Sequence, residues 1–400
     1  MSERRRRPLT ARGLGAIVLG VLFAIAANVV SAPILVYVAV LLFVLTVLSV
    51  LVVYVPRRSG TVTRQVSTDL LTVGEESRVT VRFALRSLRI PHGRWRDVLP
   101  DAVTGDAAGD YPPDAGVLRY PITGVRRGIW PVGPLVLRTV DPFGLAQREQ
   151  VFGETRTVTV VPEVIPLAPL AAHWGAAGGT AHMSSSRLGQ GSDNLSPRHY
   201  VSGDSMRRIH WRATAHRGEL MVRQEEEESS PDAIVVIDRA ARRWARPDRG
   251  VDAAFESAVS ACASIALHLA GEGYSVDVLD SAGTTIGTLR GHEDDRDELL
   301  VALAILAPRG ESRDLASIVG GTPPGPLVVI TGSISAADQE LLHHGGAAVP
   351  ILLAAHPAPE LLTTASAAGF TCAVLTDDIA ASWELALPER MLAGGGRVPR

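Results

Sequence analysis

Residues 13–56 read GLGAIVLGVLFAIAANVVSAPILVYVAVLLFVLTVLSVLVVYVP, and no residue in this stretch is charged. Pro33 divides it into Leu14–Ala32, of 19 residues, and Ile34–Val55, of 22 residues. At about 1.5 Å per residue, each part is long enough as a helix to cross a hydrocarbon core about 30 Å thick. Neither part has the polar face that a soluble helical hairpin would show. We therefore predict two transmembrane helices joined by a short turn.

Arginines flank this stretch and predict its orientation. Arg12 and the arginines at 4–7 precede the first helix, and Arg57, Arg58 and Arg64 follow the second, whereas the turn at Ser31–Pro33 is uncharged. Cytoplasmic flanks carry the excess of arginine in membrane proteins. We therefore expect a multi-pass protein of the cell membrane, with both ends and the soluble body in the cytoplasm.

A secretory signal peptide is the competing interpretation. Val30-Ser31-Ala32 offers small residues after a basic start and an apolar core. A proline directly after such a site disfavours cleavage, and a second apolar stretch follows at once. We therefore favour an uncleaved hairpin.

The charged residues exclude several classes of protein. All 39 basic residues are arginine and nearly balance 42 acidic residues, so the net charge of −3 gives no indication of nucleic-acid binding. Without lysine the chain cannot build a Walker A loop, a protein-kinase site or a Schiff-base site. The two cysteines, Cys262 and Cys372, lie far apart in apolar segments and are expected to be buried and unpaired.

Residues 57–166 are expected to form a β-sandwich. Arg78–Arg86 alternates apolar and polar residues, as does a strand buried on one face, and Leu135–Val140 and Thr157–Val161 are further strand candidates. Short strands with frequent turns are typical of immunoglobulin-like and related sandwiches. The expected turn clusters are Gly105–Gly109, Tyr111–Gly116, Gly124–Gly128 and Asp141–Gly144.

After a Gly-, Ala- and Ser-rich linker at 171–196, short apolar runs alternate with helical segments, the clearest being Val251–Gly271. This pattern predicts an α/β domain with a mostly parallel sheet covered on both faces. No glycine-rich phosphate loop follows its first strand, so a dinucleotide site is not supported. The expected strands are Ala233–Asp238, Ser275–Leu279, Leu327–Thr331, Val349–Leu353 and Thr371–Leu375.

The chain is thus expected to consist of six segments. They are a basic cytoplasmic tail (1–12), the transmembrane hairpin (13–56), the β-sandwich (57–166), a linker with a motif segment (167–230), the α/β domain (231–390) and a disordered tail (391–400).

Two motif segments give the chain a family resemblance. The first motif segment contains RGIWPVGP at 127–134 and DPFGL at 141–145. The second motif segment contains RHYVSGD at 198–204, RRIHWRATA at 207–215 and GELMVRQE at 218–225. Together they resemble the bacterial family known as domain of unknown function fifty-eight. The resemblance implies an N-terminal transmembrane pair, a β-domain, a C-terminal von Willebrand factor A-like domain and association with a MoxR-type AAA+ ATPase. It implies no established catalytic activity.

Von Willebrand A domains often hold a divalent metal through Asp-x-Ser-x-Ser after the first strand. At the matching place this chain has Asp238-Arg239-Ala240-Ala241-Arg242, which keeps the aspartate and lacks both serines. Thr331-Gly332-Ser333, in a later loop, lacks the expected aspartate. Magnesium needs several oxygen ligands, so we expect no metal site here. The nearby arginines at 242, 243, 246 and 249 are expected to be solvated.

The second motif segment is the candidate functional site. In a structural role, Asp204 and the glutamates at 225–228 would pair with arginines, while Ile209 and Trp211 would anchor the segment against the α/β domain. In a catalytic role, His199, Asp204 and His210 would form an acid–base site, although no nucleophile is placed beside them. The candidate docking or structural residues are Tyr200, Gly203, Asp204, Arg207, Arg208, His210, Trp211 and Arg212.

Two functions follow from these alternatives. The favoured one is a membrane-tethered scaffold or adaptor without catalytic, cofactor or metal residues, whose partners are the lipid bilayer and a MoxR-type AAA+ ATPase. The other is a hydrolase-like enzyme using His199, Asp204 and His210. In an enzyme these three side chains would converge in an open pocket, whereas in a scaffold they would be paired or scattered.

The orientation can be tested with reporter fusions after Arg58. Because arginines flank both ends of the hairpin, a cytoplasmic reporter is expected to be active there, as measured in intact cells. Activity of a periplasmic-type reporter at the same position would contradict the predicted orientation.

Overall fold

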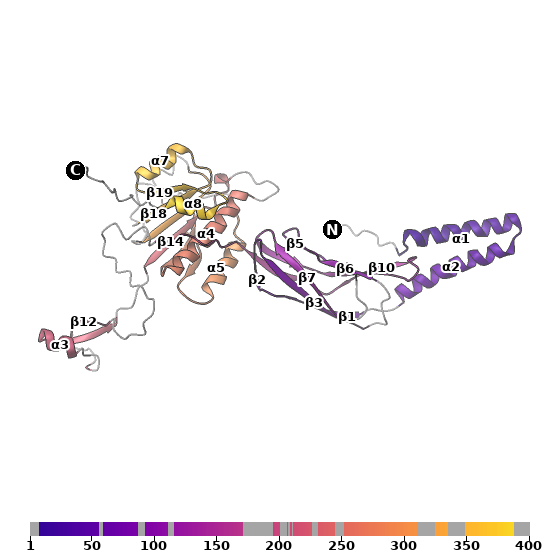
Figure 1. The fold of residues 1–400 in the computed structure, drawn as a ribbon, viewed down its shortest axis with the longest axis horizontal. Coiled ribbons are helices and arrows are strands. Elements are labelled where there is room, and N and C mark those ends of the chain that lie inside the picture. Colours follow the sequence, from indigo (N-terminus) through magenta and orange to yellow (C-terminus); the bar gives the residue numbers. More distant parts are fainter. Residues whose placement is uncertain are drawn as a thin grey trace, which may run out of the picture. The chain divides into compact units, whose positions relative to one another are not determined.

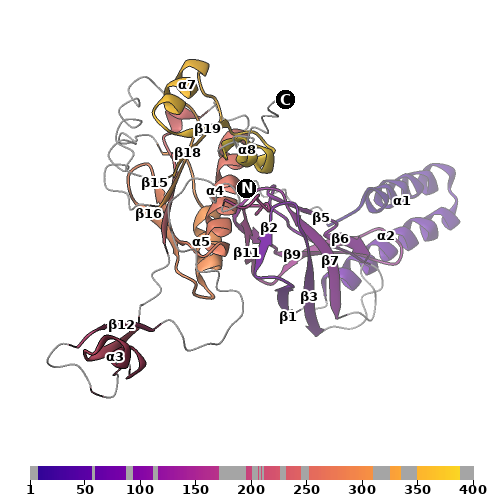
Figure 2. The same ribbon diagram turned by 60° about the vertical axis from the view of Figure 1, so that its left-hand side comes forward.

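The computed structural model divides the chain into two compact units, which Figures 1 and 2 show from two directions. The first unit comprises Met1–Glu163 with Asp297–Ala307, and the second comprises Val164–Arg296 with Pro308–Arg400. The structure describes residues 8–55, 59–86, 93–110, 116–170, 195–200, 206, 209, 211–225, 231–244, 252–309, 325–334 and 349–387.

Two apolar helices, α1 (Ala11–Val30) and α2 (Pro33–Tyr54), form an N-terminal hairpin (Figure 1). Thr10 caps α1 by accepting a hydrogen bond from the N–H of Gly13 at 3.1 Å. Pro33 begins α2, where its missing N–H costs nothing. Both helices are long and apolar enough to cross a membrane, which confirms the predicted pair of apolar helices. A third helix, Ala253–Gly271, also meets these criteria, but it packs on the sheet of the α/β domain.

Small side chains bring α1 and α2 together. A Cβ on Gly20 would lie 3.3 Å from the ring of Phe43, so the helices approach closely there. A seven-residue repeat keeps one stripe of each helix facing its partner, and small residues allow close approach within a membrane. The buried repeat is Gly13, Gly20 and Ala27 in α1, and Ala39, Thr46 and Val53 in α2.

The β-domain contains strands β1–β11 in three sheets, two of which are antiparallel like those of the predicted β-sandwich. Two sheets, in the orders β1-β3-β7-β5 and β10-β9-β4-β6, are antiparallel throughout, and the third, β2-β11-β8, includes one parallel pair, β2 with β11. The strands are β1 (Ser59–Val66), β2 (Leu70–Thr72), β3 (Glu76–Arg86), β4 (Gly93–Asp97), β5 (Val103–Gly105), β6 (Ala108–Asp110), β7 (Val117–Gly124), β8 (Gly128–Val132), β9 (Leu135–Val140), β10 (Gln147–Phe152) and β11 (Arg156–Val161).

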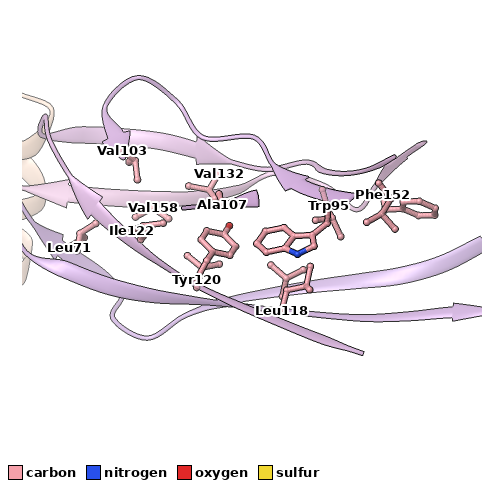
Figure 3. Packing of buried hydrophobic residues seen from close by; sticks show 14 of the residues in the cluster. Leu71, Trp95, Val103, Ala107, Leu118, Tyr120, Ile122, Val132, Phe152 and Val158 are labelled. Atoms are coloured by element: carbon pink, nitrogen blue, oxygen red, sulfur yellow. The ribbon is translucent and has the colours of Figure 1, made fainter. Parts of the chain in front are cut away.

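The apolar core of the β-domain lies between these sheets. Figure 3 shows Trp95 of one sheet facing Tyr120 of another, with ring centroids 5.6 Å apart. On β3, Val79 and Val81 are fully buried while Arg78 and Arg82 are exposed, which confirms the predicted alternation. Strand β3 therefore has one face in the core and one in solvent.

A buried ion pair joins Arg64 and Asp97 inside this core. The guanidinium donates to both carboxylate oxygens, at 2.9 and 2.7 Å, and to the carbonyl oxygen of Glu154 at 2.9 Å. The hydroxyl of Tyr120 also donates to Asp97, and burial, followed by the Asp97 charge, raises the pKa of Tyr120. The expectation that Arg64 is a flanking charge of the hairpin is wrong, because its charge is neutralised inside the domain.

The α/β domain contains a sheet of order β16-β15-β14-β17-β18-β19. Every pair is parallel except β15 with β16, so the five predicted strands are confirmed and β16 is an unpredicted antiparallel edge. The elements are β14 (Asp232–Ile237), α4 (Ala253–Gly271), β15 (Ser275–Asp280), β16 (Thr285–Leu289), α5 (Asp295–Ala304), β17 (Pro326–Thr331), β18 (Val349–Ala354), α7 (Pro359–Ala367), β19 (Thr371–Val374) and α8 (Ile379–Ala386).

The strand order of this sheet defines a position at which ligands bind in similar sheets. Numbered along the domain, the strands lie in the order 3-2-1-4-5-6, which reverses direction between β14 and β17. In open α/β sheets, ligands bind outside the carboxyl ends of the strands at such a reversal. Asp238 directly follows β14, and Thr331 ends β17, so both lie at this position.

Two details differ from the sequence-based expectation. The predicted turn at Gly105–Gly109 is partly wrong, because Gly105 ends β5 and the last two residues of the cluster lie in β6. Glycine is required at position 105 for a reason other than a turn: a Cβ there would lie 2.4 Å from the carbonyl oxygen of Pro121 on the paired strand.

The predicted linker at 171–196 lies outside the described residues, except that its last two residues begin β12 (Leu195–His199).

Both cysteines are free, as expected. Cys262 is fully buried in α4, and this burial raises the pKa of its thiol to about 12. Cys372 is partly buried in β19. Cys262 therefore behaves as a small apolar side chain rather than a nucleophile.

The buried ion pair gives a stability prediction for the β-domain. Asp97→Ala is expected to lower the free energy of unfolding by about 3–5 kcal/mol, because it leaves the Arg64 charge buried without its carboxylate. Thermal and denaturant unfolding of the full chain in detergent would measure this loss. The matched control is Asp110→Ala, whose pair with Arg94 is 3.6 Å long with side chains 92% and 74% exposed. The control is expected to cost less than about 1 kcal/mol, and equal losses would contradict a special role for the buried pair.

Candidate functional site

The second motif segment folds as a strand, a short helix and a second strand. Strand β12 (Leu195–His199) pairs antiparallel with β13 (Met221–Glu225), and α3 (Trp211–Arg217) lies between them in sequence. We call this unit the motif hairpin. Tyr200, Trp211 and Arg212 are among its described residues. The candidates Gly203, Asp204, Arg207, Arg208 and His210 lie outside the described residues.

A small local core holds the motif hairpin together. Ile209, Met221 and Val222 are at most 4% exposed, and Ile209 forms an antiparallel bridge with Val222. Thr214 of α3 accepts a hydrogen bond from the N–H of Met221 at 3.0 Å. Ile209 is therefore buried, but the contact that the structure shows for it is with β13, whereas the sequence predicted an anchor against the α/β domain.

Trp211 is not the buried anchor expected from the sequence. Its side chain is 68% exposed, and Arg212 beside it is also exposed. The physical reason is the size of the unit: α3 has seven residues and lies on a two-stranded hairpin, which offers little apolar surface to cover an indole. Met206 and Leu220 of the same segment are 64% and 41% exposed. The motif hairpin thus presents large apolar side chains to solvent.

His199 is the described member of the proposed catalytic group. Its Nδ1 lies 3.1 Å from Glu219, and the two side chains are 65% and 69% exposed. Glu219 is thus an acidic partner that the sequence-based interpretation did not identify for His199. Asp204 and His210 lie outside the described residues, so their convergence with His199 stays a prediction.

Asp238 lies at the reversal point of the α/β sheet and is completely buried. Its Oδ1 accepts a hydrogen bond from the N–H of Ala240 at 2.9 Å, and its Oδ2 accepts one from the hydroxyl of Thr331 at 2.8 Å. Nε of Arg243 lies 3.2 Å from the same Oδ2, and Arg243 is 6% exposed. The expectation that Arg243 is solvated is therefore wrong, whereas Arg242 is exposed as expected. Arg246 and Arg249 lie outside the described residues.

These donors do not fit the divalent cation that a von Willebrand A-like fold implies. Both oxygens of Asp238 accept hydrogen bonds, and a guanidinium already supplies positive charge beside them. Gly332, next to Thr331, packs closely on the Arg243 backbone, since a Cβ there would lie 2.2 Å from the carbonyl oxygen of Arg243. Within the part of the chain that the structure describes, no group of three or more His, Cys, Asp or Glu residues is arranged to hold a metal ion. The guanidinium of Arg243 thus lies against the Asp238 carboxylate, where a divalent cation would need a free oxygen ligand.

A second ion pair lies beside the first. Nη1 of Arg239 lies 3.2 Å from Oδ2 of Asp280, at the end of β15, and both side chains are largely buried. The other oxygen of Asp280 accepts hydrogen bonds from the N–H groups of Ala282 and Thr284, each at 2.9 Å. Internal arginines therefore neutralise both aspartates that follow these neighbouring strands.

The RGIWPVGP part of the first motif segment is structural. Arg127 is buried and donates to the carbonyl oxygens of Leu303 and Leu306, at 3.1 and 2.5 Å, in the stretch 297–307 that belongs to the same unit. These carbonyls lie at the C-terminal end of α5, where a cation is favourable. Gly133 has a φ of +100°, and a Cβ there would lie 2.6 Å from Nη2 of Arg64.

The DPFGL part of the first motif segment joins the β-domain to the apolar hairpin. Asp141 folds the turn by accepting hydrogen bonds from the N–H groups of Phe143 and Ala146, at 2.9 and 2.6 Å. The carbonyl oxygen of Leu145 then accepts a hydrogen bond from the N–H of Thr10 at 3.0 Å. A Cβ on Gly13 would lie 2.1 Å from that carbonyl oxygen, so only glycine fits at this position of α1.

The following strand holds the other helix of the apolar hairpin. Arg148 of β10 donates to the carbonyl oxygen of Tyr54 at 3.2 Å, and its guanidinium lies 5.2 Å from the centre of the Tyr54 ring. The hydroxyl of Tyr54 donates to the carbonyl oxygen of Gln147 at 3.3 Å. Residues 141–148 therefore contact the start of α1 and the end of α2. We call this set of contacts the clasp.

Comparison with known proteins agrees with the family resemblance of the second motif segment. The family described as "Protein of unknown function DUF58" matches residues 196–321, which is less than half of the chain. No curated protein matches the sequence.

Similar solved structures cover about a quarter of the chain each. They are the CARDB domain of the PF1109 protein from Pyrococcus furiosus in complex with di-metal ions (15% identity, 27% of this chain, 96% of that chain, TM-score 0.19), a conjugative transposon lipoprotein from Bacteroides eggerthii (12%, 24%, 97%, 0.15) and the bacterial hydrophobin BslA (10%, 24%, 98%, 0.16). At these TM-scores the likenesses carry no argument about fold or function.

The environment of Asp238 leads to a prediction about how divalent cations affect the stability of the chain. Millimolar magnesium, manganese or calcium is expected to leave the melting temperature of the full chain unchanged, because Arg243 already neutralises the carboxylate. The melting temperature in detergent, with and without each ion, would test this. A rise that Asp238→Ala abolishes would show that the carboxylate does bind a metal. The role of the arginine itself can be tested separately. Arg243→Met is expected to lower the free energy of unfolding by about 3–5 kcal/mol, because it leaves the Asp238 carboxylate buried without the guanidinium.

Proposed function

We propose that this chain is a membrane-anchored adaptor that holds a protein partner near the cytoplasmic face of the membrane and has no catalytic activity of its own. The apolar hairpin supplies the anchor, and the arginine-rich flanks at 4–7 and 57–58 support a cytoplasmic body. The clasp supports a scaffold role in particular. Through it the β-domain contacts both helices of the anchor, so its orientation relative to the helices is fixed and does not depend on a flexible linker.

The observation that carries the docking role is the exposed indole of Trp211. Tryptophan is enriched among the few residues that dominate binding energy in protein interfaces, and arginine is enriched there too. Trp211 is 68% exposed, has Arg212 beside it, and lies within the segment that matches the DUF58 family. A folded protein gains nothing in stability from leaving such a side chain in water. A partner that covers it would bury a large apolar area.

The partner we propose is a MoxR-type AAA+ ATPase, as the family resemblance implies. The proposal is supported by the open, mostly parallel sheet of the α/β domain, whose reversal point is the position where such sheets bind ligands. Arg243 and Arg239 neutralise the aspartates there, which favours recognition without a bridging metal ion.

Binding of the full chain in detergent to a purified MoxR-type ATPase from the same organism would test this function. Trp211→Ala is expected to weaken binding by about tenfold or more, corresponding to at least about 1.4 kcal/mol, because the indole would be lost from the interface. The melting temperature is expected to stay at the wild-type value, since the side chain is exposed.

Leu385→Ala is the matched control, because Leu385 is 75% exposed in α8, outside the motif hairpin. Its binding is expected to equal that of the wild type. If Trp211→Ala binds as tightly as the wild type, the proposed docking role of the motif hairpin is wrong.

A further inference from the structure

Phe143 is an exposed aromatic residue in a turn that lies beside the start of the apolar hairpin. It lies in the turn between β9 and β10, and its side chain is 55% exposed. The next residue, Gly144, has a φ of +72° and accepts a hydrogen bond at its carbonyl oxygen from the hydroxyl of Thr10. Thr10 is the N-cap of α1. The turn is therefore fixed beside the first residues of the helix.

The distance from this turn to the apolar part of α1 is short. Thr10 and Leu14 are four residues apart, which corresponds to about 6 Å along a helix axis. Headgroup regions add roughly 5–8 Å to each side of the hydrocarbon core. When Leu14 lies at the edge of the core, Thr10 and the turn that binds it lie within the headgroup layer.

The groups around Phe143 suit this layer. Nη1 of Arg12 lies 3.5 Å from the position that a Cβ on Gly144 would take, so a guanidinium lies beside the residue that follows Phe143. At the end of α2, Tyr54 is 39% exposed and Arg148 lies against its ring. Aromatic and arginine side chains concentrate at membrane interfaces, where the ring meets the acyl boundary and the cation meets phosphate.

The turn itself does not require an exposed phenylalanine. Asp141 receives its hydrogen bonds from backbone N–H groups, including that of Phe143, so the side chain at 143 plays no part in folding the turn. An apolar ring that the fold does not need, fixed beside a membrane-spanning helix, fits a lipid partner.

We propose that the β9–β10 turn is a membrane-interface contact, in which Phe143 inserts into the headgroup layer of the leaflet that holds the start of α1. This inference rests on the proposed membrane anchoring. It gives the β-domain three fixed points on the membrane, since α1, α2 and the turn all meet the same leaflet.

The strand register supplies a control position at the other end of the β-domain. Ser59, which follows the hairpin, pairs with Arg86 at one end of β3, whereas Glu76 at the other end pairs with Thr123. Val125 follows Thr123 in the turn after β7 and is 54% exposed. It therefore resembles Phe143 in exposure and lies at the end of the sheet away from the hairpin.

Fluorescence quenching in lipid vesicles would test the contact. The full chain with Cys372→Ser would carry an environment-sensitive fluorophore on Phe143→Cys, on Val125→Cys or on Val47→Cys in the middle of α2. Cys262 is fully buried and stays unlabelled. The vesicles would contain phosphatidylcholine and phosphatidylglycerol, with lipids bearing a nitroxide near the headgroup or deep in the acyl chain.

The label at 143 is expected to be quenched at least about twofold more than the label at 125 by the shallow nitroxide. The label at 47 is expected to be quenched best by the deep nitroxide. If the label at 47 is quenched and the label at 143 is quenched no more than the label at 125, the proposed interface contact is wrong, whereas the proposed membrane anchor is supported. If neither lipid quenches the label at 47, the proposed membrane anchor is wrong, and the proposed interface contact is wrong as well.

Discussion

A short antiparallel pairing of backbone joins the apolar hairpin to the β-domain, and the arrangement of the first unit depends on it. The N–H of Gln147 donates to the carbonyl oxygen of Pro8 at 2.9 Å, and the N–H of Thr10 donates to that of Leu145 at 3.0 Å. Hydrogen bonds of this kind are directional, so they fix the angle between strand and helix as well as the distance. The residue types of DPFGL follow from this pairing: Asp141 folds the turn, and Gly144 adopts the positive φ that brings the chain back to Thr10.

Buried arginine is the second constraint in this chain. Arg64 is paired with Asp97 in the β-domain, and Arg243 is paired with Asp238 in the α/β domain. A planar guanidinium can donate to a carboxylate in two parallel hydrogen bonds and keeps its charge at every physiological pH. The Arg64–Asp97 pair has this two-bond geometry, and neither pair depends on the concentration of a free ion, as a metal site does. The site at the reversal point of the α/β sheet is thus neutralised by the protein itself.

Sequence patterns predicted the elements that depend on neighbouring residues and failed where burial depends on distant ones. The apolar helices, the alternation on β3 and the five α/β strands follow from local periodicity. Arg64 was taken for a surface charge because its partner, Asp97, is 33 residues away. Arg243 lies only five residues from its partner Asp238, but the burial of this pair also involves Thr331 of β17, which is 93 residues from Asp238. Trp211 was expected to be buried because tryptophan usually is, but the motif hairpin is too small to cover it. Five of the eight candidate residues lie outside the described part of the chain, among them Asp204 and His210, so the catalytic alternative for the second motif segment stays a prediction.

The turn between α1 and α2 consists of Ser31 and Ala32. In the proposed anchoring, with both ends of the hairpin on one side of a bilayer, helices this long leave only that turn on the far side. Such a protein offers almost no surface to ligands, proteases or binding proteins on the other side. Under that proposal, a ligand or partner would reach the protein from the compartment that holds its β- and α/β domains or from the lipid, and the hairpin would anchor the protein without transmitting a signal across the membrane.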